Sequence, residues 1–406
     1  MKILVFSHKL DVGGAQVNAI EITEALRDLH GHDVALFATP GPMVKVVEEK
    51  RLPFLPAPVT NDRPSVAMTR ALSEAIRRER PDVIHVWDSS QWLVSYYAVN
   101  LFKRIPIVLT DMGSDDVPRH LPKSLPTTFG TPELVERARM AGRRRAALLL
   151  PPVDVYRNAP DAVDPRSFRE HYGLKNNEIA IVTVSRLANS MKAESLRRTI
   201  ETIRALGRDL PLRFFIVGDG EARVELERLA SQTNNELGRV AVVLTGELLD
   251  PRLAYAAADI VIGMGGSALR GMAFAKPAII VGVQAFSAPF TPETAESFYY
   301  KGMYGKGDGS PSNARLIADV RALCEHPDQF LALGEFSRQF VAQHFSLESV
   351  SAHLAEFCRA AVADVPQFHI AAADGLRTSL VVLGRRFVPD RLRRRVKRYE
   401  LEKQRG

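Results

Sequence analysis

The segment formed by residues 179–282 constrains the fold more than any other part of the chain. It reads as a β-branched strand, a polar loop and a helix, then as a second strand, a glycine turn and a helix, and further strands and helices follow in alternation. This order is typical of a parallel sheet with helices packed on its faces. Ligands bind such open sheets at the carboxyl ends of the strands, so the loops that follow the strands form the candidate site.

Two cations lie in the loop after the first of these strands. Residues 179–185 (IAIVTVS) are followed by Arg186, a polar turn and Lys192, and apolar residues then recur at helical spacing. A guanidinium fork and an ammonium group can stabilise the charge that grows on a departing diphosphate when no metal is present. We therefore predict that Arg186 and Lys192 bind phosphate and are catalytic, the alternative being surface charge on a loop.

Two glycine turns border the same predicted edge. Residues 213–220 (RFFIVGDG) form a strand that ends in a turn, and residues 259–264 (DIVIGM) form a strand that runs into a second turn and a helix. Serine is a favourable N-cap, and the first-turn amides and the dipole of a helix attract anions. The residues predicted to bind a donor phosphate are Gly218, Gly265, Gly266, Ser267 as the N-cap, Ala268 and Leu269. The alternative is a close-packed helix entry.

The first half of the chain repeats the same rhythm. Strands are predicted over residues 2–7, 33–38, 82–87, 106–110 and 146–150, and helices over residues 16–29, 66–79, 93–102 and 131–141. Gly13 and Gly14 lie between the first strand and the first helix, where backbone amides can approach a diphosphate, although an ordinary tight turn would also need them. The chain thus reads as two α/β domains, followed by helices over residues 312–362.

Composition places the chain among soluble globular proteins. Apolar residues make up 46% and charged residues 25% of the 406 residues, which is enough for two cores. Cys324 and Cys358 lie far apart in helical sequence, which argues against a disulfide framework or a cysteine metal site. The chain shows no cleavable leader and no apolar run near the roughly 20 residues that cross a bilayer. We expect a cytoplasmic protein.

The basic charge is concentrated at the end of the chain. Residues 384–406 hold ten Lys or Arg and three acidic residues, a net charge of +7 that equals the charge of the whole chain. Leu392, Val396 and Tyr399 would form a narrow apolar stripe on a basic helix. Residues 385–406 are predicted to lie on an anionic membrane surface, the alternative being a solvated terminal helix. No aromatic stacking platform accompanies the charge, so nucleic acid is not an expected partner.

Several of these segments together resemble a known family. VSRLANSMK, VGDGEARVELERLA and RGMAFAKPAIIVG resemble the carboxyl-terminal half of the retaining GT-B glycosyltransferases of family 4, or glycosyl transferases group 1, and KILVFSHKLDVGGAQ resembles their opening strand and loop. The resemblance implies an α/β fold of two Rossmann-like domains that face each other across a cleft. The implied parts are an acceptor-side domain (1–157), a linker (158–175), a nucleotide-sugar domain (176–345), and terminal helices with the basic tail (346–406).

The resemblance also assigns residues around the donor. Gly246 and Glu247 follow a strand where relatives hold the base through backbone contacts. Relatives carry a Glu-x7-Glu pair near the last glycine turn, whereas this chain lacks the pair and has Arg270 where the second Glu usually holds the donor ribose. Arg270 is predicted either to face solvent or to bond a ribose or phosphate oxygen.

The sugar side departs further from the family pattern. A His-x-His often ends the strand that reads DVIHVW here, and this chain keeps only the first histidine, His85, with Trp87 at the second position. We predict His85 as a catalytic residue, and Trp87, Asp88 and Asp111 as sugar or acceptor contacts, because these residues lie at strand ends. The alternative is a core histidine, a packing tryptophan and two turn aspartates.

The predicted activity is transfer of a sugar from a nucleotide diphosphate sugar to an acceptor, with retention, without a metal and without a bound cofactor. The expected acceptor is a glycan, a lipid-linked or a small-glycoside acceptor, and the basic tail predicts association with the cytoplasmic face of a membrane. Two alternatives stay open. The loss of the acidic pair suits a non-catalytic nucleotide-sugar-binding protein, and a nucleotide-sugar epimerase has the same fold.

Overall fold

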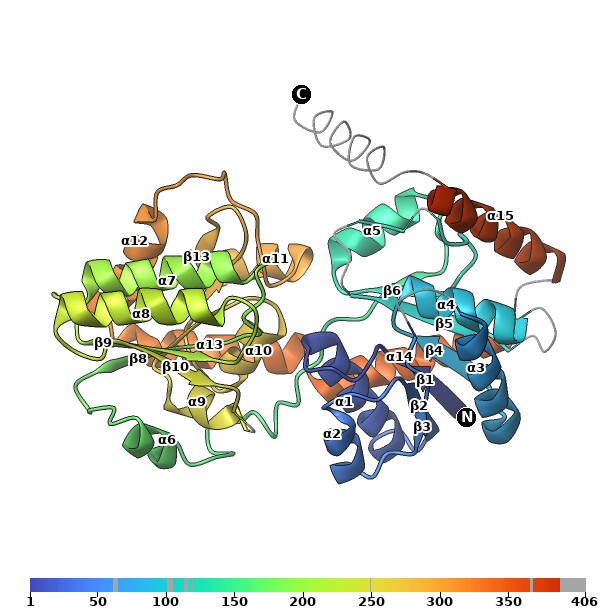
Figure 1. The fold of residues 1–406 in the computed structure, drawn as a ribbon, viewed down its shortest axis with the longest axis horizontal. Helices are drawn as coiled ribbons and strands as arrows, with labels where there is room; N and C mark the ends of the chain where they lie inside the picture. The colour runs from blue at the N-terminus through green and yellow to red at the C-terminus, as the bar shows by residue number, and fades with distance from the viewer. Residues whose placement is uncertain are drawn as a thin grey trace.

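Two α/β domains lie side by side in the computed structural model of the chain (Figure 1). The structure describes residues 1–60, 65–100, 105–112, 116–118, 120–248, 250–365 and 368–387. Each domain is built around one mainly parallel sheet that is covered by helices. This architecture confirms the two Rossmann-like domains that the alternation of strands and helices predicts.

The N-terminal domain contains a seven-stranded parallel sheet in the order β3-β2-β1-β4-β5-β6-β7. Its strands are β1 (Lys2–Phe6), β2 (Asp33–Ala38), β3 (Phe54–Pro56), β4 (Val83–Val86), β5 (Ile107–Asp111), β6 (Thr127–Phe129) and β7 (Ala146–Leu148). Its helices are α1 (Gly14–Asp28), α2 (Val44–Glu49), α3 (Val66–Glu79), α4 (Ser89–Ser95) with a π-helical continuation (Tyr96–Asn100), and α5 (Pro132–Met140).

The C-terminal domain contains a six-stranded sheet in the order β10-β9-β8-β11-β12-β13, in which only β13 runs antiparallel to its neighbour. Its strands are β8 (Ile179–Val184), β9 (Leu212–Val217), β10 (Val242–Gly246), β11 (Ile260–Gly263), β12 (Ala278–Val281) and β13 (Ser287–Pro289). Its helices are α6 (Arg166–His171), α7 (Ala193–Leu206), α8 (Arg223–Leu237), α9 (Arg252–Ala257), α10 (Gly266–Ala273), α11 (Pro292–Lys301), α12 (Ala314–Glu325) and α13 (Gln329–His344).

The strand order fixes where a ligand can bind in each sheet. In the N-terminal sheet, the chain adds strands on one side of β1 and then crosses to the other side at β4. In the C-terminal sheet, the same reversal lies between β8 and β11. Loops that leave neighbouring strands in opposite directions open a crevice at their carboxyl ends. The site therefore forms from the loops after β1, β4, β8 and β11.

The last helices return to the N-terminal domain. After α13, the chain forms α14 (Leu347–Ala363), which packs against α1, and α15 (Phe368–Phe387), which lies along the outer side of the N-terminal domain (Figure 1). His30 Nε2 in the N-terminal domain lies 2.8 Å from Ser351 Oγ of α14. Within the described part of the chain, none of the helices combines the length and the apolar character needed to cross a membrane.

Candidate functional site

The loop between β8 and α7 carries the two predicted phosphate-binding cations. Arg186 is exposed, whereas Lys192 is partly buried at the N-cap position of α7. Burial, and then the positive charge of Arg186, lowers the pKa of Lys192 to about 8. Neither cation has a carboxylate partner among the residues that the structure describes. Two neighbouring cations without a counter-charge form a site that favours an anion.

The glycine turn after β9 packs against the backbone of this basic loop. A Cβ atom on Gly218 would lie 2.0 Å from the carbonyl oxygen of Ser185, and one on Gly220 would lie 2.7 Å from that of Leu187. Both glycines have positive φ, +136° and +151°. The Leu187 amide donates a hydrogen bond to the turn over 2.9 Å. The close approach of two backbones explains these glycines, so Gly218 shapes the loop that carries Arg186.

The start of α10 forms the second predicted phosphate contact, with a different cap from the one expected. Gly265, at φ +59°, is the N-cap, and the prediction that Ser267 caps the helix is wrong. Ser267 lies within the first turn, where its hydroxyl donates to the carbonyl of Val184 and accepts from Tyr255 Oη at 3.2 Å. Its side chain joins the helix to the sheet because the Val184 carbonyl lies at the end of β8.

Two of the predicted amides at this helix start are already engaged. The Gly265 amide donates to the Met303 carbonyl over 2.6 Å, and the Leu269 amide makes the first intrahelical bond, to Gly265, over 3.1 Å. These bonds correct the prediction that Gly265 and Leu269 offer their amides to a phosphate. Within the described part of the chain, the amides of Gly266, Ser267 and Ala268 donate no backbone hydrogen bond. These are the first-turn amides of α10, which have no partner within the helix.

The basic loop and the start of α10 meet at one narrow cavity. Ser185, Lys192, Gly263 and Ser267 all line it. The structure thus brings together the loops after β8 and β11, as the switch point between these strands requires. The combination of an ammonium group and helical first-turn amides is suited to phosphate oxygens.

Arg270 extends from α10 toward the other domain. Its Nη2 atom lies 3.0 Å from Glu21 Oε2 on α1, and the two side chains are only 16% and 19% exposed. Arg270 Nη1 also donates to the Gly266 carbonyl over 3.4 Å. This pairing corrects the solvent-facing alternative for Arg270, while a bond to a ribose or phosphate oxygen stays a prediction.

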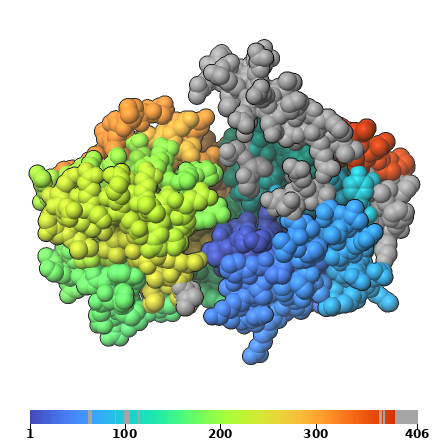
Figure 2. All heavy atoms as spheres, in the orientation of Figure 1, coloured from blue at the N-terminus to red at the C-terminus, as the bar shows by residue number. Residues whose placement is uncertain are grey.

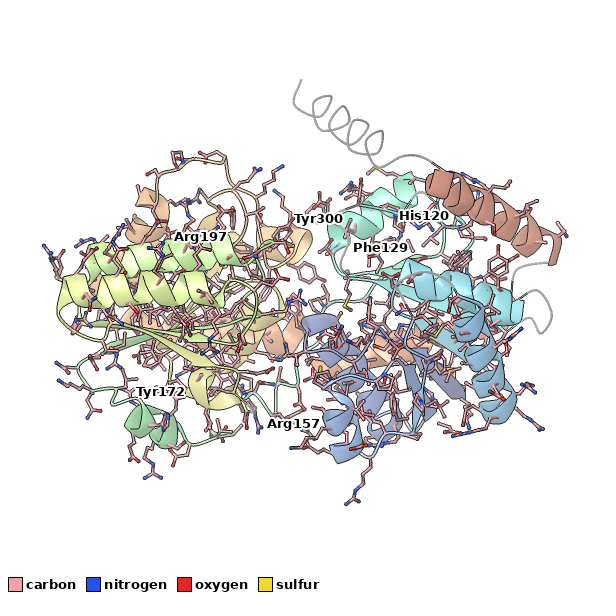
Figure 3. The ribbon with its side chains drawn as sticks, in the orientation of Figure 1. His120, Phe129, Arg157, Tyr172, Arg197 and Tyr300 are labelled. Carbon is pink, nitrogen blue, oxygen red and sulfur yellow. The ribbon has the colours of Figure 1, made fainter. Side chains whose placement is uncertain are left out.

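A second contact joins the domains near the end of α11. Tyr300 Oη donates a hydrogen bond to Glu136 of α5, and Figure 3 shows Tyr300 directed from α11 toward the N-terminal domain. A third contact involves Arg157 between the domains, whose guanidinium lies 3.5 Å from Glu24 of α1. Glu136 and Glu21 belong to the N-terminal domain, so two acidic side chains of that domain receive donors, Tyr300 and Arg270, from the C-terminal domain.

The Gly13–Gly14 turn lies at the start of α1. Gly13 is the N-cap, and no side chain caps the helix. The first intrahelical bond runs from Val17 to the Gly13 carbonyl over 3.0 Å, which leaves the preceding amides at the surface of the loop after β1. This placement, at the switch point of the N-terminal sheet, is compatible with the predicted approach of these amides to a diphosphate.

His85 and Trp87 lie inside the N-terminal domain. His85 is fully buried, its Nε2 lies 2.7 Å from Thr110 Oγ1, and burial lowers its pKa to about 3, so the ring is neutral. Trp87 is also buried, with its ring centroid 5.4 Å from that of His85. The rings lie in the core that α1 and α14 cover. The prediction that His85 is catalytic is therefore wrong for the structure as it stands, and Trp87 packs beside it.

The two aspartates at strand ends have different surroundings. Asp88 is the N-cap of α4, where its carboxylate accepts from the Ser90 amide at 2.6 Å and lies 3.7 Å from His8 Nε2. Burial alone would raise the pKa of Asp88, but the hydrogen bonds from His8 and Ser90 lower it below its ordinary value. Asp111 is the last residue of β5 and is partly buried. Asp88 thus has a local structural role, and Asp111 stays a prediction.

The predicted base contacts lie on the edge strand of the C-terminal sheet. Gly246 ends β10 with φ +75°, and its carbonyl accepts from the Gly218 amide at 2.8 Å. Glu247 is exposed just beyond it. The backbone of Gly246 therefore helps to hold the glycine turn beneath the basic loop, while contact with a base stays a prediction.

Sequence reasoning missed a carboxylate that joins the loops of this site. Glu194, in the first turn of α7, accepts hydrogen bonds from the amides of Gln284 (3.1 Å) and Ala285 (2.8 Å). Gln284 and Ala285 have φ of +54° and +66°, values that favour glycine. The loop of Gln284 pairs with the glycine-rich segment 302–309, which also supplies the Met303 carbonyl to Gly265. The signal that could have pointed here is the spacing of glycines in GMYGKGDG.

The described residues hold no group of three or more His, Cys, Asp or Glu side chains that could bind a metal ion. Lys192 lines the cavity at the switch point together with Ser267 of α10, and Arg186 lies close enough to help lower the pKa of Lys192.

Two family models match the loops that build this site. The model described as Glycosyltransferase Family 4 matches residues 12–154, and the model described as Glycosyl transferases group 1 matches residues 178–295. Together these matches cover more than half of the chain. The chain belongs to the family 4 glycosyltransferases. The family resemblance predicted from the sequence motifs is confirmed, and so is the class of enzyme.

Solved structures share the fold of this glycosyltransferase over most of its length. A glycosyltransferase from Rickettsia africae is 17% identical with a TM-score of 0.72, covering 89% of this chain and 98% of that chain. Anabaena HepE in complex with UDP-glucose is 16% identical with a TM-score of 0.67, covering 89% and 100%. The UDP-GlcNAc 2-epimerase of Neisseria meningitidis is 12% identical with a TM-score of 0.60, covering 89% and 100%. These likenesses show the GT-B fold, in which two Rossmann-like domains face each other across a cleft.

A search of curated proteins finds none that matches this glycosyltransferase.

Proposed function

We propose that this family 4 glycosyltransferase transfers a sugar from a UDP-sugar to a hydroxyl acceptor, with retention at the anomeric carbon. The observation that carries the proposal is the pair formed by Arg186 and Lys192, two adjacent cations that have no carboxylate partner among the described residues. The UDP and UDP-glucose complexes of HepE support uridine as the nucleoside. Retention is supported by the family to which the chain belongs.

The proposed chemistry depends on stabilisation of the leaving group. When the bond between sugar and phosphate breaks, negative charge develops on the diphosphate oxygens. In this proposal, Arg186, Lys192 and the first-turn amides of Gly266, Ser267 and Ala268 receive that charge, which is supported by the cavity that Lys192 and Ser267 both line. Lys192 contributes fully only when protonated, and a diphosphate beside it raises its pKa above about 8. Positioning and charge stabilisation supply the rate enhancement, without a side chain acting as nucleophile.

The proposed acceptor is a glycan, a lipid-linked saccharide or a small glycoside that binds on the N-terminal side. The loops after β1 and β4 form the switch point there, and the amides near Gly13 and Gly14 face that edge. We propose a cytoplasmic location, with the enzyme at the cytoplasmic face of a membrane where the acceptor is lipid-linked. Beyond the donor and the acceptor, the proposal requires no resident cofactor or metal.

Calorimetric titration with UDP tests the donor site. Arg186→Ala and Lys192→Ala each remove charge-assisted hydrogen bonds of about 1.5 to 3 kcal/mol, so each should raise the Kd for UDP by roughly 10 to 100-fold. Arg208→Ala is the matched control, because Arg208 is an exposed cation beyond the other end of α7. Unchanged UDP affinity in both site variants would contradict the assignment of the donor site.

One observation favours a second candidate function, binding of a nucleotide sugar without transfer. Arg270 stands in place of the family acid and is committed to Glu21 of the other domain. Incubating the protein with UDP-sugars, with and without saccharide acceptors, distinguishes the candidates. Transfer requires acceptor-dependent release of UDP, a binding protein gives no release under either condition, and an epimerase such as the Neisseria relative would alter the sugar without any acceptor.

A further inference from the structure

The helix α15 packs on the N-terminal domain through small and polar residues. Gly375 and Thr378 are buried, and a Cβ atom on Gly375 would meet the ring of Tyr96 at 2.0 Å. On the same side of the helix, Asp374 accepts a hydrogen bond from the Ser124 hydroxyl over 2.5 Å. Ser379 makes a hydroxyl contact with Tyr97. Among the described side chains of this helix, Asp374, Gly375, Thr378 and Ser379 thus contact the N-terminal domain.

The outer face of α15 carries several exposed apolar side chains together with His369 and Arg377. Leu376 is 64% exposed, Leu380 is 62% exposed and Val381 is 37% exposed. Leu376 and Leu380 are four residues apart and lie one turn above the other, and the exposed Ala373 precedes Leu376 by three residues. A helix on the surface of a soluble domain ordinarily turns its apolar face inward. Here Leu376 and Leu380 face solvent instead, and adjacent exposed apolar side chains of this kind mark an interaction surface.

The charge of the chain indicates what this surface contacts. Arg377 is exposed on the same face, next to Leu376. The helix leads into Arg385 and Arg386 and then into residues 388–406, which lie outside the described part of the chain. Residues 384–406 carry the net charge of +7 that equals the charge of the whole protein. An apolar stripe continued by clustered cations is the chemistry that recognises an anionic lipid surface.

We propose that the outer face of α15 docks this enzyme on an anionic membrane surface. The side chains of Leu376, Leu380 and Val381 enter the headgroup region, and the net charge of +7 on residues 384–406 favours anionic over neutral lipid. A protein partner is disfavoured by size, because a stable interface buries about 800 Å² on each partner and needs a complementary shape, whereas a lipid surface accommodates a single helical stripe. The proposal does not rest on the donor site, since no residue of that site belongs to α15.

Sedimentation of the full chain with lipid vesicles tests the docking surface. Vesicles of phosphatidylcholine alone are compared with vesicles that also contain phosphatidylglycerol. The wild type should sediment with the anionic vesicles only, and less so as salt is added, because screening weakens the lipid attraction of the arginines. The double variant Leu376→Ser/Leu380→Ser should lose roughly tenfold or more in vesicle partitioning, because it removes two leucines that the lipid would bury.

Matched controls make the outcome decisive. Leu331 lies on α13 and is 77% exposed, so Leu331→Ser removes an equally exposed leucine outside the proposed surface and should leave vesicle binding unchanged. The serine variants should keep the melting temperature of the wild type, because the replaced side chains face solvent. Vesicle binding by the double variant that equals the wild type would overturn the proposal.

Two further results would also overturn it. Wild-type protein that fails to bind anionic vesicles would exclude this surface as a lipid contact. A wild type that sediments as a dimer, together with a monomeric double variant, would assign the face of α15 to a second copy of the chain.

Discussion

Arg270 Nη2 lies 3.0 Å from Glu21 Oε2, and this pair joins the donor-side helix α10 to α1 of the opposite domain. The two residues are 249 positions apart in the sequence. The ion pair stands at the position where family members usually carry a glutamate for the donor ribose. In this enzyme, α10 therefore contributes to the contact between the domains.

Exchange of these two charges tests their coupling. Arg270→Glu should destabilise the protein because it places two carboxylates against each other, and Glu21→Arg should do the same with two cations. The double variant Glu21→Arg/Arg270→Glu restores the attraction, so its stability should exceed the sum of the single effects by about 1 kcal/mol. Chemical denaturation measures this coupling. Additive effects in the double variant would show that the pair carries no interaction energy.

The affinity for UDP should depend on pH through Lys192. In the free protein, burial and Arg186 hold the pKa of Lys192 at about 8, and a bound diphosphate raises it. The affinity for UDP is therefore highest below pH 8 and falls as pH rises through that value. The Kd for UDP then rises by up to tenfold per pH unit. Calorimetry in buffers of different ionisation enthalpy measures the linked proton uptake. Lys192→Arg should abolish this dependence because a guanidinium stays charged, and a variant that retained the same pH profile would assign the titration to another group.

Gly218→Ala should disrupt the basic loop beyond the cost of backbone strain. The new Cβ atom would lie 2.0 Å from the Ser185 carbonyl oxygen, so the loop that carries Arg186 must move. Gly238→Ala is the control, because Gly238 also has positive φ (+65°) but no atom lies within 4 Å of its Cβ position. We expect a loss of about 1 kcal/mol of stability in the control, and a larger loss together with weaker UDP binding for Gly218→Ala. Equal effects would show that the close approach is unimportant.

Glu194 should hold the loop of Gln284 and Ala285 in its positive-φ conformation. Glu194→Gln removes the charge that strengthens the two amide hydrogen bonds, and we expect a loss of about 1 kcal/mol of stability. Hydrogen exchange should become faster at the amides of residues 284 and 285. Glu201→Gln serves as the control, since Glu201 is exposed on the same helix. Protection at these amides that is unchanged in Glu194→Gln would contradict the role of this carboxylate.

Most long strands and helices could be predicted from periodicity. The apolar run of β8 (Ile179–Val184) and the helix α3 (Val66–Glu79) lie within one residue of their predicted bounds. The helix predicted over residues 93–102 begins earlier, at Ser89, because Asp88 caps it. The three-residue strands β3, β6 and β13 were not predicted, whereas β7, which is equally short, was predicted from the longer apolar run 146–150 in which it lies.

The positions of candidate site residues could be predicted where they follow from the order of strands and loops in the sequence. They could not be predicted where they depend on tertiary contacts. Arg186 and Lys192 follow a strand directly, so topology alone places them at the sheet edge. The N-cap of α10 depends on the backbone of Gly265, and the partner of Arg270 comes from the other domain. His85 follows the family motif, yet its side chain points to the buried face of β4. No local pattern distinguishes these possibilities.

The path of the last helices has a consequence for how the protein forms during synthesis. The space-filling view in Figure 2 shows the two domains in contact with each other, and α14, which packs against α1, is made only after the entire second sheet. The contact of His30 can form only after Ser351, 321 residues later in the chain, has been synthesised. We expect the second domain to reach its final packing on the ribosome first, while the α1 surface stays exposed to solvent and chaperones until the chain is almost complete.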